Sequence, residues 1–215
     1  MIPVIGFATL SKFDLADRLL ASIDYPVQDL VVVNNSGTKQ WIPTKPDSVK
    51  NLWHIEVPYG LGANGAWNLI IKATPHAQYW VLPNDDSHFE PGALEKIEAE
   101  VDTEAFNFVK VNPKWSCVVP GEGAIQKAGL WDELFYPIYY DDNDYERRMI
   151  HHGVKFNDID AVVHHDNSST LRSGYEDRNK YTFNRNQRAY IKKCESNDYS
   201  VHGWDINTRR ANSWD

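Results

Sequence analysis

The sequence is poor in cysteine and has no long apolar run. Its two cysteines, Cys117 and Cys194, are too few for a disulfide framework, so we expect reduced thiols in a cytoplasmic setting. No stretch approaches the roughly 20 consecutive apolar residues that a membrane helix needs. No signal peptide is visible at the N-terminus. These absences predict a cytoplasmic protein without a membrane span.

Blocks of lysine or arginine are also missing, and the formal net charge is −8. A protein that grips a nucleic-acid backbone usually has the opposite balance, so nucleic acid is not the expected ligand. A substrate that carries phosphate would be repelled by this charge. Such a substrate would therefore need a local device, such as a metal ion, to offset the repulsion.

The chain has the length and the apolar content of one globular domain, with 215 residues of which 42% are hydrophobic. Short β-branched and apolar runs predict strands at residues 1–10, 29–33, 52–57, 78–82, 106–111, 116–119 and 161–163. Helical spacing and helix-start signals predict helices at residues 14–23, 63–73, 141–152 and 177–193, and one after Pro91-Gly92. Ser11, three residues before Asp14, predicts a capping box for the first helix. The alternation predicts a three-layer α/β/α fold around a mixed, mostly parallel sheet.

A first polar cluster follows the predicted strand at residues 78–82, where Asp85 and Asp86 come directly after an apolar run. Ligands of open α/β sheets bind outside the carboxyl ends of the strands. Mg²⁺ and Mn²⁺ prefer carboxylate oxygens and often take only one or two from the protein, with substrate phosphates supplying others. Two adjacent acids in a turn can also cap the next helix or face water, so the dipeptide alone leaves both interpretations open.

A second cluster, Asp141-Asp142-Asn143-Asp144, opens the predicted helix at residues 141–152. The helix dipole favours acids at this position, so a structural role is available. Three carboxylates within four residues nevertheless exceed what capping requires. Crowded acids raise one another's pKa, which suits one of them to general-base work. Arg148, on the same helix, can pair with these acids or with phosphate.

A third cluster, His164-His165, follows the predicted strand at residues 161–163. A single histidine is more often structural than a ligand, yet neutral imidazole binds Mn²⁺ and other transition metals. Each cluster alone is a weak signal. Their order along the chain and their placement at strand ends together favour a binding site.

In this order the clusters resemble the motifs of the GT-A glycosyltransferases, especially the family 2-like, rhamnosyltransferase-like group. VLPNDDSHFEPGAL is similar to the segment in which a strand runs into the Asp-x-Asp motif, with Asn84 in place of the first acid. YGLGANGAWN, DDNDYERRM and VVHHDNSST resemble the glycine–asparagine, acidic and late-histidine segments of that family. RNKYTFNRN resembles its terminal Arg-Asn helix. The resemblance covers roughly residues 3–190.

The resemblance implies a metal-dependent, inverting glycosyltransferase with a Rossmann-like GT-A domain over residues 1–190 and a C-terminal extension over residues 191–215. It implies that Mn²⁺ or Mg²⁺ is held by Asp86 and by one of the two adjacent histidines, with His164 as the first choice and His165 as the alternative. It implies Asp142 as the catalytic base, supported by Asp141 and Asp144. The residues that it assigns to the nucleotide sugar are Thr9, Asn34, Asn35, Gly62, Asn68, Asn84, Asp85 and Arg148.

The expected donor is a UDP-, GDP- or dTDP-linked sugar, and the expected acceptor is a hydroxyl of a glycan, a protein or another molecule. Two other classes remain open. A nucleotidyltransferase that makes a sugar nucleotide usually carries a glycine-rich loop with a basic residue straight after the first strand, and FATLSKFD offers none. A non-catalytic domain that binds nucleotide or sugar would not need the acidic cluster at residues 141–144.

Overall fold

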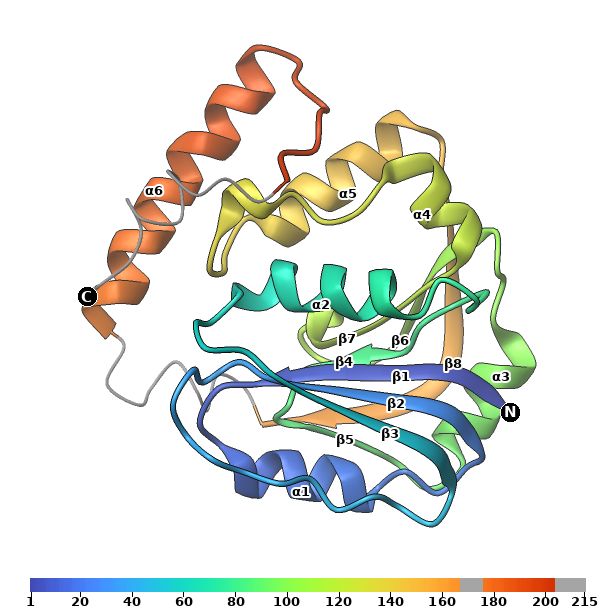
Figure 1. The fold of residues 1–215 in the computed structure, drawn as a ribbon. Helices are drawn as coiled ribbons and strands as arrows, with labels where there is room; N and C mark the ends of the chain where they lie inside the picture. Colours follow the sequence, from blue (N-terminus) through green and yellow to red (C-terminus); the bar gives the residue numbers. More distant parts are fainter. Residues whose placement is uncertain (167–175, 204–215) are drawn as a thin grey trace.

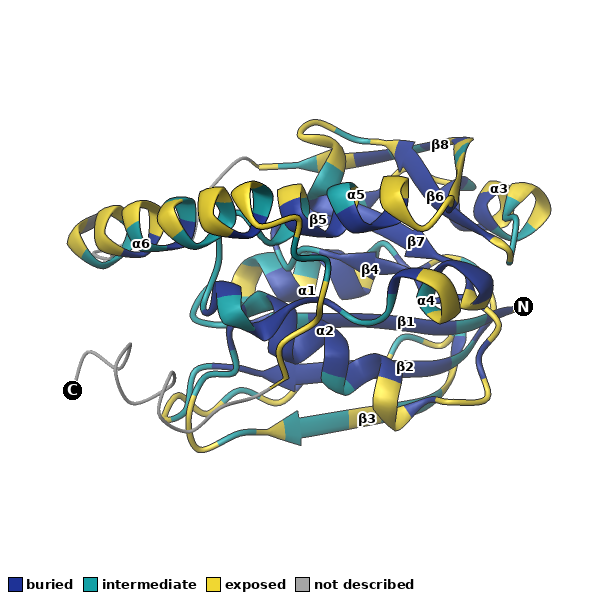
Figure 2. Ribbon diagram, turned by 90° about the horizontal axis from the view of Figure 1, so that it is seen from above, coloured by how far each residue is buried: buried dark blue, intermediate teal, exposed yellow. Residues whose placement is uncertain are grey.

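The frame of the molecule is a mixed β-sheet made from two groups of strands. The computed structural model describes residues 1–166 and 176–203 (Figure 1). The first group is parallel, in the order β1-β2-β3, and consists of β1 (Ile2–Thr9), β2 (Val27–Asn34) and β3 (Val49–Glu56). β1 and β2 are apolar along most of their length because a parallel sheet with both faces covered buries both sides of its strands. Figure 2 shows these two strands buried and β3 partly exposed.

The second group has the order β4-β7-β6-β8-β5. Its strands are β4 (Leu82–Pro83), β5 (Ser87–Phe89), β6 (Ala105–Lys110), β7 (Cys117–Pro120) and β8 (Lys155–His165). β6 and β8 are parallel, and the other three pairings are antiparallel. The two groups are joined where the Gly6 amide donates to the Val81 carbonyl at 2.9 Å and the Val81 amide donates to the Val4 carbonyl at 3.0 Å.

Helices cover both faces of this sheet (Figure 1). α1 (Phe13–Ala21) and α3 (Ala93–Glu100) bury their apolar sides against one face. α2 (Gly62–Ala73), α4 (Glu122–Ala128) and α5 (Asp141–His151) pack on the other. The remaining helical elements are the short turns η1 (Lys114–Ser116) and η2 (Glu133–Phe135) and the long helix α6 (Glu176–Glu195). This three-layer α/β/α arrangement confirms the predicted fold class.

Two local predictions in the N-terminal half are wrong in detail. α1 begins at Phe13 with Lys12 at its N-cap and without a side-chain cap, so the capping box predicted at Ser11 does not form. The strand predicted at residues 78–82 is reduced to the two residues of β4. Residues before Leu82 make only isolated bridges, such as the one from Val81 to Ile5, because two different neighbours meet this short segment.

The C-terminal half is more regular than its sequence indicates. The strand predicted at residues 161–163 is the end of the eleven-residue strand β8. α6 runs on to Glu195, past the domain boundary expected after residue 190. Figures 1 and 2 show α6 extending beyond the body of the molecule at its N-terminal end. Within the described ranges, no helix is both long and apolar enough to cross a membrane.

Candidate active site

A cleft of about 1050 Å³ opens at the carboxyl ends of β1, β2 and β4. Its walls are the turns after these strands, the start of α2, the loop at residues 135–140 that we call the aromatic loop, the start of α5 and one side of α6. Among the residues predicted from the sequence, those that line this cleft are Thr9, Asn35, Gly62, Asn84, Asp85, Asp86, Asp141 and Asp142. The fold therefore brings most of the predicted site together, because parallel strands deliver their ends to one edge of the sheet.

The turn after β4 carries the first pair of acids. The Asn84 amide donates to the Ser116 carbonyl at 2.8 Å, which ties this turn to the end of η1. Both acids line the cleft, but Asp86 is only 5% exposed, whereas Asp85 is half-buried. Burial raises the pKa of the Asp85 carboxyl to about 7, and the neighbouring Asp86 carboxylate adds to the rise, while the Thr9 hydroxyl and the Leu10 amide oppose it.

A histidine of β8 completes this corner of the cleft. The His165 Nε2 lies 2.8 Å from the Asp86 Oδ1, and both side chains are almost completely buried. His164 lies on the other side of β8, since successive side chains of a strand point in opposite directions. There it pairs across the strands with His88, and the two rings stack with their centroids 4.9 Å apart. The histidine beside Asp86 is thus His165, the alternative to the first choice from the sequence, His164.

The glycine-rich segment before α2 is fixed by Asn35. The Asn35 Oδ1 accepts the Leu61 amide at 2.6 Å, and its Nδ2 donates to the Gly62 carbonyl at 3.2 Å. Gly62 has φ +73°, and a Cβ there would lie 2.7 Å from the Pro137 carbonyl oxygen. A glycine is therefore required for α2 to begin against the aromatic loop. Asn34 is turned away, since its Nδ2 donates to the Lys39 carbonyl at 2.8 Å, and it does not line the cleft.

The second pair of acids opens α5. Asp141 and Asp142 both line the cleft from the first turn of this helix. Burial raises the pKa of the Asp141 carboxyl to about 7, and the charge of Asp142 adds to the rise. The Asp142 Oδ1 accepts the amide of Asn143 at 2.8 Å. Burial and a like charge thus give this corner of the cleft a carboxyl that exchanges its proton near neutral pH.

Three residues predicted for the site lie in the interior instead. The Arg148 Nε and the Asp144 Oδ2 are 2.8 Å apart, and the Lys193 Nζ lies 2.9 Å from the other oxygen of Asp144. Arg148 and Asp144 are completely buried, so neither reaches a ligand in the cleft. Asn68 binds the backbone of Trp131 through both atoms of its amide, at 2.9 and 3.0 Å. These polar side chains satisfy one another or the backbone, as buried polar groups must.

Two parts of the cleft wall were not predicted as site residues. The aromatic loop contributes Tyr136, Tyr139 and Tyr140, and α6 contributes Arg178 and Phe183. The aromatic run before Asp141 was visible in the sequence, but its role depends on contacts with a helix about fifty residues later. Among the described lining residues, the basic side chains are Arg178 and His165, against four carboxylates.

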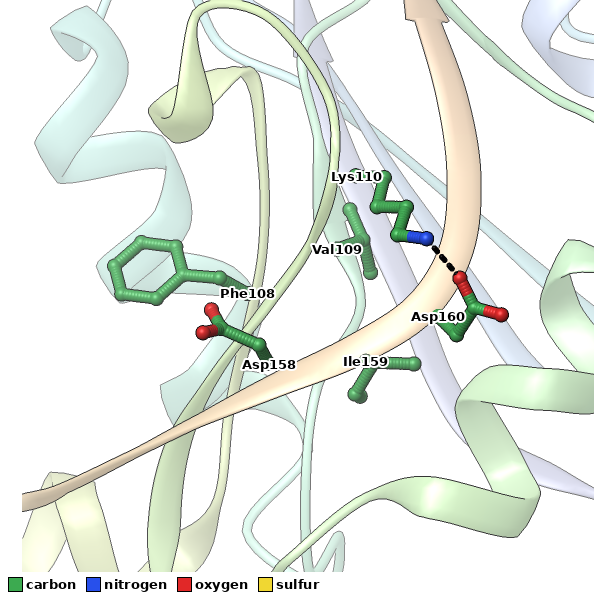
Figure 3. A pocket seen from close by; sticks show the side chains of 6 residues that line it. All are labelled: Phe108, Val109, Lys110, Asp158, Ile159 and Asp160. Carbon is green, nitrogen blue, oxygen red and sulfur yellow. Dashed lines mark ion pairs between the residues drawn. The ribbon is translucent and has the colours of Figure 1, made fainter.

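A second, smaller hollow of about 490 Å³ lies where the pairing of β6 and β8 shifts in register (Figure 3). Lys110 and Asp160 form an ion pair at its rim, and more than half of each side chain is exposed. Exposed pairs of this kind contribute little to stability or binding. The hollow shares no lining residue with the cleft, and we assign it no role.

Comparison with known proteins places this geometry in a structural context. No protein-family model matches the sequence, and no curated protein matches it either. Among solved structures, S. aureus TarS, a GT-A-like glycosyltransferase, superposes with a TM-score of 0.59 at 11% identity, over 77% of this chain and 36% of the TarS chain. The chain has a glycosyltransferase-like fold. A structure of TarS residues 1–349 in complex with UDP-GlcNAc matches at a TM-score of 0.57 and 12% identity, over 76% of this chain and 58% of that one.

A structure of TarS 1–349 in complex with UDP gives a TM-score of 0.58 at 11% identity, over 76% of this chain and 60% of the other. The chain thus spans less than two thirds of the length of these structures. The likeness identifies the fold.

The corner formed by Asp86 and His165 has the donor chemistry of a divalent metal site. It offers a carboxylate oxygen and an imidazole nitrogen within 2.8 Å of each other at the wall of the cleft. Neutral imidazole suits Mn²⁺, and carboxylate suits Mn²⁺ and Mg²⁺. No group of three histidine, cysteine, aspartate or glutamate residues that could hold a metal occurs in residues 1–166 and 176–203. The protein would supply two ligands, with phosphate oxygens and water as the rest, which fits the habit of Mg²⁺.

Proposed function

We propose that the chain is a metal-dependent, inverting glycosyltransferase that moves a sugar from a nucleotide-sugar donor to an acceptor hydroxyl. The observation that carries the proposal is the convergence of two acidic pairs in one cleft, Asp85-Asp86 after β4 and Asp141-Asp142 at the start of α5. Asp85-Asp86, together with His165, suits the binding of a cation and a diphosphate. Asp141-Asp142 suits removal of a proton from the acceptor. A glycosyltransferase-like fold with this cleft at its strand ends agrees with that division of labour.

The donor end of the cleft lies at the ends of β1 and β2. Thr9, Asn35 and the glycine-rich start of α2 meet there, where Gly60 and Gly62 let the chain pass close to the backbone of Asn35 and Pro137. We assign this end to the nucleoside part of a UDP-, GDP- or dTDP-linked sugar. Asp85, beside Thr9, is placed to contact the ribose or the sugar.

Asp86 and His165 would hold Mn²⁺ or Mg²⁺ beside the diphosphate. When bound, the metal supplies positive charge that stabilises the departing nucleoside diphosphate. The protein residues keep the two side chains oriented, because both are nearly buried and the Asp86 carbonyl accepts the Asp166 amide at 3.1 Å. The excess of carboxylates in the cleft explains why a cation is needed there at all.

The base comes from the pair Asp141-Asp142. The resemblance to GT-A enzymes assigns this role to Asp142, and the geometry adds Asp141 as an equal candidate. A general base works best when its pKa lies near the working pH, and the pKa of Asp141 is raised to about 7. In a single displacement, the base takes the proton of the acceptor hydroxyl as its oxygen bonds to the anomeric carbon and the bond to the diphosphate breaks.

Release of nucleoside diphosphate from a panel of nucleotide sugars, measured with Mn²⁺ present, tests the proposal. We expect release from at least one donor, faster with the correct acceptor. We expect the substitution that removes the base, Asp141→Asn or Asp142→Asn, to lower the rate of nucleoside diphosphate release by about 100-fold or more. Asp158→Asn makes the same chemical change on the exposed side of β8 and serves as the control. Full activity in both cleft variants would refute the assignment. A nucleotidyltransferase would release no nucleoside diphosphate from these donors, and would instead release pyrophosphate from a nucleoside triphosphate and a sugar 1-phosphate.

A further inference from the structure

We propose that Asn186 is a positioning residue for this reaction. Its side chain holds the turn formed by Tyr139 and Tyr140, so that the acids that follow, Asp141 and Asp142, face the cleft. Asn186 does not line the cleft and so does not touch a substrate there. Its importance for catalysis rests on the function proposed above, but its effect on the turn does not.

The amide of Asn186 connects α6 to the aromatic loop. Its Nδ2 donates to the carbonyl oxygens of Phe135, Ile138 and Tyr139, at 3.0, 2.7 and 3.0 Å. Its Oδ1 accepts the Nε of Arg185 at 2.9 Å. A carbonyl cannot donate and a guanidinium cannot accept, so the orientation of the amide is fixed by its partners. Asn186 is completely buried, and water does not compete for these bonds.

The turn that it holds has an unfavourable backbone conformation. Tyr139 and Tyr140 have φ of 74° and 65°, which places two successive residues with side chains in the left-handed region. Such residues keep this conformation only where the surrounding structure determines it. Two of the three carbonyls that bind Asn186, those of Ile138 and Tyr139, belong to this turn. The amide therefore acts on the strained backbone itself.

The turn sets the first residue of α5. Tyr140 is the N-cap of this helix, and its carbonyl accepts the Asp144 amide at 3.0 Å. The direction of the helix start decides where Asp141 and Asp142 point, since they are its first two residues. The rings of Tyr139 and Tyr140 pack on Phe183 of α6, with centroids 5.5 and 5.2 Å away, and support the turn from the side.

Arg185 strengthens the same attachment. Its Nη2 donates to the carbonyl of Leu134 at 3.2 Å and also binds the carbonyl of Tyr136. Burial lowers the pKa of this guanidinium from its ordinary value, which is consistent with a group enclosed by backbone. Two consecutive residues of α6 thus bind five carbonyls at residues 134–139. Without them, nothing else among the described contacts bonds the carbonyls of Ile138 and Tyr139.

Asn186→Ala tests the proposal, with Asn184→Ala, an exposed position of the same helix, as the matched control. The first readout is hydrogen exchange of the Asp144 backbone amide, which reports whether this amide is still bound to the carbonyl of Tyr140, the N-cap of α5. The second is the rate of transfer together with calorimetric affinity for nucleoside diphosphate. We expect faster exchange and a loss of about 100-fold in kcat with unchanged nucleotide affinity, because an error of about 1 Å in a catalytic group costs this much.

Unchanged exchange at Asp144 in folded Asn186→Ala protein would overturn the proposal, whatever the activity. A parallel fall of nucleotide affinity and kcat would also overturn it, since that indicates general loss of structure. If Asn186→Ala does not fold, Arg185→Lys keeps the charge but cannot span the same carbonyls, and the same two criteria apply to it. If the wild-type protein transfers no sugar from any donor, the proposed function fails, and the exchange measurement still decides the role of Asn186.

Discussion

The raised pKa of Asp141 predicts that this residue destabilises the protein at neutral and alkaline pH. Asp141 lines the cleft beside Asp142, and burial together with that neighbouring charge disfavours its ionised form. Asparagine has nearly the same shape and no charge. Asp141→Asn should therefore be more stable than the wild-type protein where the wild-type carboxyl is ionised, as is common for catalytic residues that are not optimised for stability.

The sign and size of the effect follow from linkage. The pKa of Asp141 is about 7 in the folded protein, whereas the ordinary value, expected in the unfolded chain, is 3.8. Between these two pH values the folded state therefore binds more protons than the unfolded state. The free energy of unfolding is then lost as pH rises from about 4 to about 7, and no further above it. At about 1.4 kcal/mol per pKa unit the full displacement corresponds to about 4 kcal/mol. Because Asp141 lines an open cleft, where solvent screens its charge, we expect about 2 kcal/mol.

Urea unfolding of the wild-type protein and of Asp141→Asn at pH 4, 6 and 8 measures this gap directly. The two proteins should have equal stability at pH 4, and the variant should exceed the wild type by about 2 kcal/mol at pH 8. Asp158→Asn, on the exposed surface, should show no such gap. A variant that is less stable than wild type at pH 8, or a gap that does not change with pH, would refute the electrostatic account of the acidic pair.

Three further predictions concern other parts of the cleft and its support. Gly62→Ala should lower the free energy of unfolding by about 1–3 kcal/mol in chemical denaturation, because Gly62 has φ +73° and no space for a Cβ. Gly153 also has a positive φ but open space around it, so Gly153→Ala should lower the free energy of unfolding by less. Asp144→Ala should cost about 3–5 kcal/mol, since it leaves Arg148 and Lys193 buried without their shared carboxylate, and a loss below about 1 kcal/mol would contradict the pairing. His165→Ala should raise the Mn²⁺ concentration needed for half-maximal nucleotide binding. His164→Ala should not, because of the two histidines it is His165 that lies beside Asp86. Equal effects of the two substitutions would refute the assignment of the metal to Asp86 and His165.

The architecture was readable in the sequence, and so was the meeting of several strand ends at one cleft. Alternating apolar runs and helical segments predict an α/β sheet, and the strand ends at Thr9, Asn35 and Asp85 predict one edge where their side chains meet. The short strand β4 was overestimated, because its apolar residues are buried by two neighbours rather than by a long ladder. The local pattern of apolar residues thus predicts which residues are buried, but it does not predict how they pair with neighbouring strands.

The choice between His164 and His165 could not be made from the sequence. Adjacent residues of a strand face opposite sides, so the answer depends on the register of β8 against β5, which pairs His88 with His164. The same holds for Arg148, which sits one turn after Asp144 on α5. Its charge indicates a surface or a ligand, and only the packing of α5 against the end of α4 shows that it is enclosed, by Asp144 and by the carbonyls of Ala128 and Leu130.

The aromatic loop illustrates a third kind of limit. Its backbone is held by Asn186, about fifty residues later in the chain, and an asparagine within a polar helix gives no local sign of such a contact. Helix α6 looks like a solvated surface helix in sequence, and Figure 2 shows much of it exposed. Its connection to the site is made by Arg178 and Phe183, which line the cleft, and by the buried Asn186, which holds the aromatic loop.

In the proposed function, the cleft binds a nucleoside diphosphate group through a divalent cation at Asp86 and His165. Calorimetric titration of UDP, GDP and dTDP into the protein, with Mn²⁺ and then with a chelator, tests it most directly. We predict that at least one of these nucleotides binds with Mn²⁺, that the chelator weakens binding, and that Asp86→Ala abolishes the difference while Asp158→Asn keeps it. Binding of none of them, or binding that neither the chelator nor Asp86→Ala affects, would contradict the account.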